Sequence, residues 1–115
     1  MPHHDDAVSI RQMLDHAREA FVLVEQRVRA DLDRERVLTL ALVQLCQILG
    51  EAAGRVSAPR RQQHPEIPWS QITALRNRLI HGYDTIDLDI LWQILTGDLP
   101  PLIEALEKTI QPAKP

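Results

Sequence analysis

Four polar residues that suit chemistry at a phosphodiester lie close together in the chain, at Arg76, Asn77, His81 and Tyr83. A histidine titrates near neutral pH, so it can take a proton from a ribose 2′-hydroxyl or give one to a leaving oxygen. A guanidinium can stabilise the negative charge that develops at phosphorus. This route needs no metal ion, and no residue cluster has good metal-ligand spacing, so we expect neither metal nor cofactor. The Arg-x4-His spacing alone is weak support, because it occurs by chance in many helices.

The element expected to carry these residues is a helix that opens at residue 68 or 69 and ends near residue 80 or 82, where Gly82 can terminate it. Asn77 and His81 are four residues apart and would share a face. Arg76 and His81 are five apart, roughly 140° around the axis, so a straight helix does not by itself bring them together. Either the helix ends loosely near Gly82, or the Arg76 side chain reaches across Asn77. At a helix C-terminus the dipole would favour the protonated imidazole of His81.

The remaining sequence predicts an all-α fold, because apolar residues recur at helical spacing and no stretch alternates long enough for a strand. Short connections favour an antiparallel bundle of four to five helices in one domain, 1–115, with flexible tails at 1–7 and 111–115. The other expected elements are helices over 8–29 and 34–56, a loop over 57–68, a helix from Thr85 or Asp87 through Leu95, and a last helix after Gly97-Asp98. The expected caps are Asp5 or Asp6 for the first of these helices, Asp33 for the second and Asp98 for the last. The first helix carries an apolar stripe expected in the core: Met13, Leu14, Ala17, Phe21, Val24 and Val28.

The helix expected over 34–56 is apolar around most of its circumference. Either the other helices surround it, or part of it packs on another subunit. Cys46 is expected to be a small core residue, and Gly50 indicates close helix packing, with a dimer contact as one place for it. Glu51 is unusual on such a helix. It either pairs with Arg76 as a buried acid or faces solvent.

Charge is distributed unevenly along the 115 residues, whose net charge is −3. Residues 1–53 carry −3, residues 54–83 carry +4 and residues 84–115 carry −4. The average excludes a protein that coats nucleic acid non-specifically, but the basic segment leaves room for a local nucleic-acid site. A single cysteine excludes an internal disulfide and suggests a reducing compartment, so we expect a cytoplasmic protein. No run of about 18 apolar residues exists, so no membrane association is expected.

Several stretches in this order resemble a known family. They are Ile48-Leu49-Gly50-Glu51-Ala52-Ala53, Pro65-Glu66-Ile67-Pro68-Trp69, Arg76-Asn77, Leu79-Ile80-His81-Gly82-Tyr83, Leu91-Trp92, and Asp98-Leu99-Pro100 with Leu102. The chain resembles the HepT-like toxins of the HEPN superfamily, the partners of minimal nucleotidyltransferases in toxin–antitoxin pairs. The combined pattern is far more specific than Arg-x4-His alone.

The resemblance implies an HEPN-like helical bundle that forms a homodimer, with two active sites facing each other across the dimer cleft. It implies a toxin of a type VII toxin–antitoxin system that cleaves RNA as a metal-independent endo- or exoribonuclease. Arg76 and His81 would be the catalytic pair, and Asn77 would orient one of them or hold a phosphate. Tyr83 matches the tyrosine that the cognate nucleotidyltransferase modifies with AMP, which would block the site and repel RNA.

Two other functions stay open at this point. One is a non-catalytic helical module that docks and regulates a nucleotidyltransferase, and the other is a structural helical dimer with no role in nucleic-acid chemistry. Arg60, Arg61 and Arg78 are candidate RNA contacts, although a charged loop is more often simply solvated. The two tryptophans, Trp69 and Trp92, are expected to anchor the core or an interface.

Overall fold

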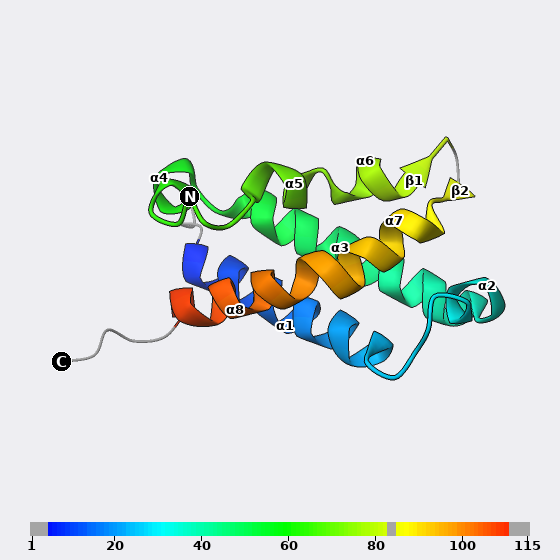
Figure 1. Ribbon diagram of the computed structural model, residues 1–115. Helices are drawn as coiled ribbons and strands as arrows, with labels where there is room; N and C mark the ends of the chain where they lie inside the picture. The colour runs from blue at the N-terminus through cyan, green and yellow to red at the C-terminus, as the bar shows by residue number, and fades with distance from the viewer. Residues whose placement is uncertain (1–4, 83–84, 111–115) are drawn as a thin grey trace.

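The computed structural model describes residues 5–82 and 85–110 (Figure 1). Its elements are α1 (Asp6–Val24), α2 (Asp31–Arg34), α3 (Arg36–Arg55), α4 (Ala58–Gln62), α5 (Trp69–Thr73), α6 (Leu75–Leu79), β1 (Ile80–His81), β2 (Thr85–Ile86), α7 (Leu88–Gln93), the π-helical turn η1 (Ile94–Asp98) and α8 (Leu99–Ile110). The predicted all-α class is confirmed, because the two strands have only two residues each. Residues 1–4 and 111–115 of the predicted tails lie outside the described residues, and so does Tyr83.

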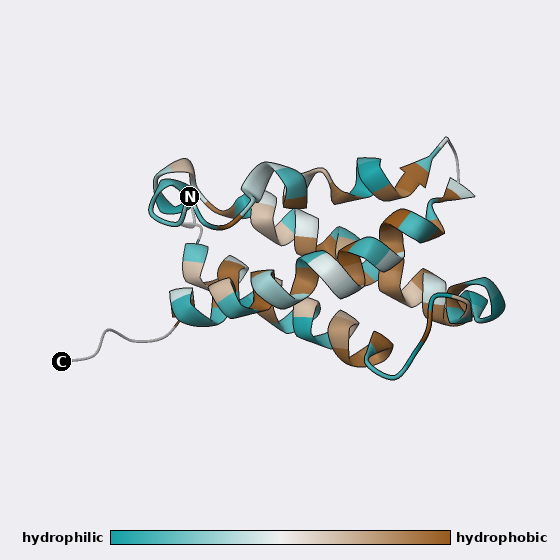
Figure 2. Cartoon of the chain, viewed as in Figure 1, coloured by the Kyte–Doolittle hydropathy of each residue, from teal (hydrophilic) through white to brown (hydrophobic). Residues whose placement is uncertain are grey.

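The core forms around α3, which packs along α1 and also against α5 and α6, while α8 lies on α1. In Figure 2 the long helices carry alternating hydrophobic and hydrophilic bands, as amphipathic helices do. The apolar side that faces inward includes the fully buried Leu14, Leu42, Leu49, Leu79, Leu95 and Leu106. By length and hydropathy alone α3 could cross a membrane, but more than half of it is buried inside the fold, as in the central helix of a bundle.

The helix α3 is buried over much of its surface but exposes apolar side chains near its start. Cys46 is a core residue as predicted, because it is buried, and this burial raises the pKa of its thiol to about 12. Near its N-terminal end, however, Val37 is 82% exposed and Leu40 is 46% exposed. This apolar surface is free in a single copy of the chain.

The N-terminal helix begins earlier than predicted. The Asp5 carboxylate accepts a hydrogen bond from the backbone N–H of Ala7 at 2.9 Å, which caps α1. Ser57 donates through its backbone N–H and its hydroxyl to the two carboxylate oxygens of Asp6, tying α1 to the start of α4. The prediction of a flexible tail over 1–7 is therefore wrong for residues 5–7.

The same helix ends at Val24, five residues before its predicted end. Val28 is 61% exposed and Phe21 is only half-buried, so their assignment to the core was wrong. The next long helix begins at Arg36, after Glu35 rather than after a cap at Asp33. Asp33 lies inside the one-turn helix α2, where its carboxylate pairs with Arg29.

The expected loop over 57–68 contains the short helix α4, which the Ser57 hydroxyl caps by accepting from Arg60. Trp69 closes this segment onto the core, as predicted for an anchor, and its indole N–H points at the carbonyls of Arg61 and His64. Trp92 is likewise half-buried against the core. The segment is therefore folded rather than an open loop.

The predicted stop at Gly97-Asp98 is also wrong, because the chain stays helical from α7 through η1 into α8 (Figure 1). The backbone N–H of Leu99 bonds the carbonyl of Ile94, five residues back. Pro100 and Pro101 follow directly and have no N–H to give to an α-helical ladder. A wider π turn fits this site, and Asp98 lies within it instead of capping a new helix.

Gly50 permits a close contact within the chain. A Cβ at this position would lie 2.9 Å from the backbone carbonyl oxygen of Ile72, so no larger residue fits without movement. The expected close helix packing is confirmed, and it joins α3 to α5 of the same chain. This contact sets where α5, and α6 after it, lie on the core.

Candidate active site

The motif residues are not on one straight helix. The helix predicted from residue 68 or 69 is broken at Ala74, which has φ −91° and ψ 5°, and it ends at Leu79. Arg76 and Asn77 lie on the short helix α6, and both side chains are exposed. Ile80 already has extended backbone, with φ −112° and ψ 120°.

His81 lies on strand β1, where it pairs with Thr85 of the antiparallel strand β2. Gly82 follows with φ +68°, a left-handed conformation that glycine adopts without strain. The helical argument for a shared face between Asn77 and His81 therefore fails, and so does the argument from the helix dipole. The sequence left open whether the helix ends loosely near Gly82 or the Arg76 side chain reaches across Asn77. The structure is nearer to the first alternative, although the helix already ends at Leu79.

The imidazole of His81 has a carboxylate partner. Its Nε2 lies 3.3 Å from Oδ2 of Asp87, and the His81 side chain is 59% exposed. The sequence offered Thr85 or Asp87 as the residue that opens the next helix, and Asp87 is its cap, since its Oδ1 accepts from the backbone N–H of Ile90 at 3.0 Å. The Ile90 N–H and then the imidazole of His81 lower the pKa of Asp87, so its carboxylate is ionised at neutral pH.

Arg76 has no ion pair or hydrogen bond from its side chain to another residue within 5–82 and 85–110. Glu51 is exposed on α3, so the expectation that it faces solvent is correct and the buried pair with Arg76 is wrong. The guanidinium of Arg76 is therefore exposed and without a partner among these described residues. Tyr83 lies in the gap between the two described ranges.

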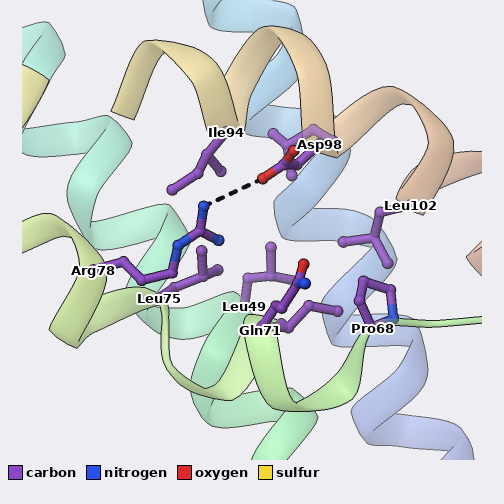
Figure 3. Close-up of a pocket in the computed structure, with 10 residues that line it drawn as sticks. Leu49, Pro68, Gln71, Leu75, Arg78, Ile94, Asp98 and Leu102 are labelled. Atoms are coloured by element: carbon purple, nitrogen blue, oxygen red, sulfur yellow. Dashed lines mark ion pairs between the residues drawn. The ribbon is translucent and has the colours of Figure 1, made fainter. Parts of the chain in front are cut away.

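Three other arginines of the basic segment, Arg60, Arg61 and Arg78, have partners. Arg78 of α6 pairs with Asp98 of η1 at 3.6 Å (Figure 3). Arg61 donates to the carbonyls of Ala53, Gly54 and Val56 at the end of α3, with its guanidinium 6.0 Å from the ring centre of Trp69. Arg60 donates to the side chain of Gln63. Arg61 and Arg78 therefore hold parts of the fold together. The RNA contacts expected of Arg60, Arg61 and Arg78 stay predictions.

The hollow in Figure 3 is too small to hold a nucleotide. It has a volume of about 30 Å³, enough for one water molecule rather than a nucleotide. Its walls are mainly apolar side chains such as Leu49, Leu75 and Leu102, and the pair of Arg78 and Asp98 lies at its rim. Arg76, Asn77 and His81 do not line it. A substrate of these three residues would bind on the outer surface of the chain.

Comparison with known proteins identifies the family of the chain. Residues 10–109 match the family model described as ribonuclease HepT-like. The chain is 31% identical over 104 residues to the protein named "Probable ribonuclease HepT" from Thermococcus cleftensis, covering 87% of this chain and 94% of that protein. It is 29% identical over 108 residues to a protein named "Putative RNase" from Caldanaerobacter subterraneus, covering 90% and 96%. A further protein named "Putative RNase", from Methanocaldococcus jannaschii, is 26% identical over 107 residues.

The chain therefore belongs to the ribonuclease HepT-like family, which confirms the resemblance seen in the sequence. No solved structure matches it significantly. The family supports the prediction of an enzyme that acts on RNA, while the roles of individual residues stay predictions.

Proposed function

We propose that this chain is a metal-independent ribonuclease and the toxin of a toxin–antitoxin pair, with Arg76 and His81 as its catalytic residues. One observation carries the proposal: in a chain of the ribonuclease HepT-like family, a guanidinium with no partner among residues 5–82 and 85–110 and an exposed imidazole with a carboxylate partner lie five residues apart on the surface. Asn77, also exposed on α6, is proposed to hold a phosphate oxygen or orient one of the pair.

The proposed reaction uses the ribose 2′-hydroxyl as nucleophile. His81 accepts its proton, the 2′-oxygen forms a bond to phosphorus, and the bond from phosphorus to the 5′-oxygen breaks. The 5′-oxygen takes up a proton from water as it leaves, and the protonated His81 afterwards returns its proton to the solvent. Arg76 stabilises the extra negative charge on the phosphoryl oxygens in the transition state. The products are a 2′,3′-cyclic phosphate and a 5′-hydroxyl.

We further propose that two copies form the working unit. The exposed Val37 and Leu40 at the start of α3 would be covered in a dimer, which removes apolar surface from water. This part of α3 lies at the same end of the molecule as β1 and β2 (Figure 1), and an ion pair of 2.8 Å joins Arg29, just before α2, to Asp89 of α7. A contact at this end would bring two basic motif segments near each other and raise the local positive potential.

The purified protein is expected to cleave a labelled single-stranded RNA in the presence of a chelator and to leave 2′,3′-cyclic phosphate ends. The same RNA with 2′-deoxyribose throughout should stay intact, because the nucleophile is missing. Gel electrophoresis with end-group analysis of the fragments measures both results. Cleavage of the deoxy strand, or complete loss of activity in the chelator, would contradict the proposed chemistry. No cleavage at all would favour the non-catalytic module that regulates a nucleotidyltransferase.

The proposed antitoxin is a minimal nucleotidyltransferase that adds AMP to Tyr83. Two residues from His81, an AMP group would occupy the phosphate site and repel RNA by its charge. Co-expression with the nucleotidyltransferase is expected to raise the intact mass by one or more AMP units and to remove RNA cleavage. The Tyr83→Phe variant should keep its original mass and its activity under the same conditions. A mass increase that persists in Tyr83→Phe would contradict Tyr83 as the modified residue.

A further inference from the structure

We propose that Asp87 is the positioning residue of this active site: it holds the proton on Nε2 of His81 and leaves Nδ1 as the nitrogen that accepts the proton of the 2′-hydroxyl. The effect of this pairing on catalysis rests on the proposed ribonuclease function. The pairing itself is a property of the fold and can be tested without a substrate.

The short hairpin brings the two residues together. Ile80 pairs with Ile86 and His81 with Thr85, so the residue after β2 is placed beside β1. The backbone N–H of Asp87 donates to the carbonyl of Leu79 at 2.8 Å, which fixes the main chain of Asp87 against the end of α6. Leu79 is fully buried, so this anchor belongs to the rigid part of the fold.

The carboxylate of Asp87 is held independently of His81. Its Oδ1 accepts from the Ile90 N–H at 3.0 Å as the cap of α7, and Leu91 fixes that helix in the core. The other oxygen, Oδ2, then faces Nε2 of His81 at 3.3 Å. An ionised carboxylate can only accept a hydrogen bond, so Nε2 must carry the proton. In the neutral imidazole, the lone pair then lies on Nδ1.

The charged groups around the imidazole leave Asp87 as its partner. Of the neighbouring elements, α6 carries Arg76 and Arg78, and Arg78 is paired with Asp98. Strand β2 carries no charged side chain, and on α7 the carboxylate of Asp89 pairs with Arg29. Within residues 5–82 and 85–110, the Asp87 carboxylate is the one charged group within ion-pair distance of His81.

The Asp87→Asn variant separates positioning from capping. An asparagine oxygen can still accept from Ile90, which keeps the start of α7, but its amide group then faces His81 as a donor. Nε2 must become the acceptor, so the proton moves to Nδ1 and the proposed base is lost. The Asp89→Asn variant is the matched control, because it removes a carboxylate two residues away that lies in an exposed ion pair with Arg29.

The test combines ring nitrogen chemical shifts with cleavage rates. Nitrogen-15 spectra of the histidine side chains, recorded at a pH where the imidazole is neutral and assigned with His81→Ala, report which nitrogen of His81 is protonated. We expect the Nε2–H form in the parent and in Asp89→Asn and the Nδ1–H form in Asp87→Asn, whose RNA cleavage should fall at least about tenfold.

Each outcome is decisive. The same tautomer in the parent and Asp87→Asn would overturn the proposal, as would a tautomer change with unchanged cleavage. If the tautomer changes but the parent cleaves no RNA, the pairing stands and the proposed function fails.

Discussion

Replacing His81 by alanine is expected to slow RNA cleavage by about 10²–10⁴-fold, the usual contribution of a general acid–base group. The variant keeps Arg76, so weak binding of phosphate should persist while proton transfer is lost. Single-turnover rates on a labelled RNA, with protein in excess over substrate, measure this loss directly. Arg76→Ala should also reduce the rate strongly, because a guanidinium in the transition state is lost while the imidazole is still present.

Loss of the fold is not expected to explain this result, because the His81 side chain is 59% exposed and its one described side-chain partner is Asp87. Thermal unfolding and sedimentation mass should match those of the parent. His16→Ala is the matched control: His16 lies on α1, half-buried, with its ring bonded to the carbonyl of Gln12. Equal cleavage by the parent and His81→Ala would remove His81 from the mechanism.

The periodicity of the sequence was sufficient to predict the class of fold, because helical spacing reports the inner face of each long helix. It also narrowed two helix caps to two candidates each, Asp5 or Asp6 and Thr85 or Asp87, and Asp5 and Asp87 are the caps. It was not sufficient where the backbone departs from ideal helix geometry. The break at Ala74 and the π turn at η1 keep the apolar spacing nearly intact, so a period of 3.6 residues does not reveal them.

The resemblance to a family implied Arg76 and His81 as the catalytic pair, and this stays a prediction. The helical face predicted for Asn77 and His81 is wrong, because α6 ends at Leu79 and His81 lies on β1. The pairing of His81 with Asp87 depends on the register of a hairpin with only two residues per strand. Strands this short show no alternation of apolar and polar residues from which they could be predicted. Gly82 and Asp87 were the available signal, since glycine and aspartate are common at the ends of helices and strands. The sequence likewise could not show that Arg78 turns toward Asp98.

Enlarging Gly50 to valine is expected to lower the free energy of unfolding by about 3 kcal/mol, at the upper end of the cost of overpacking. The new Cβ would lie 2.9 Å from the Ile72 carbonyl oxygen, which belongs to the backbone of α5 and cannot rotate away like a side chain. In a domain of this size the melting temperature should fall by roughly 10 °C. Circular dichroism during heating and urea titration measure both quantities.

Gly54→Ala is the matched control on the same helix. A Cβ at Gly54 meets only the Thr73 methyl group at 4.0 Å, an ordinary contact. Alanine there should raise stability by about 0.5–1 kcal/mol, because it is the better helix former. The opposite signs separate a steric requirement at Gly50 from a general effect of glycine in α3, and equal stability of Gly50→Val and the parent would contradict the close contact. Since Gly50 allows α5 to lie on α3, and α6 with Arg76 follows α5 directly, Gly50→Val should also lower RNA cleavage at temperatures where the variant is still folded.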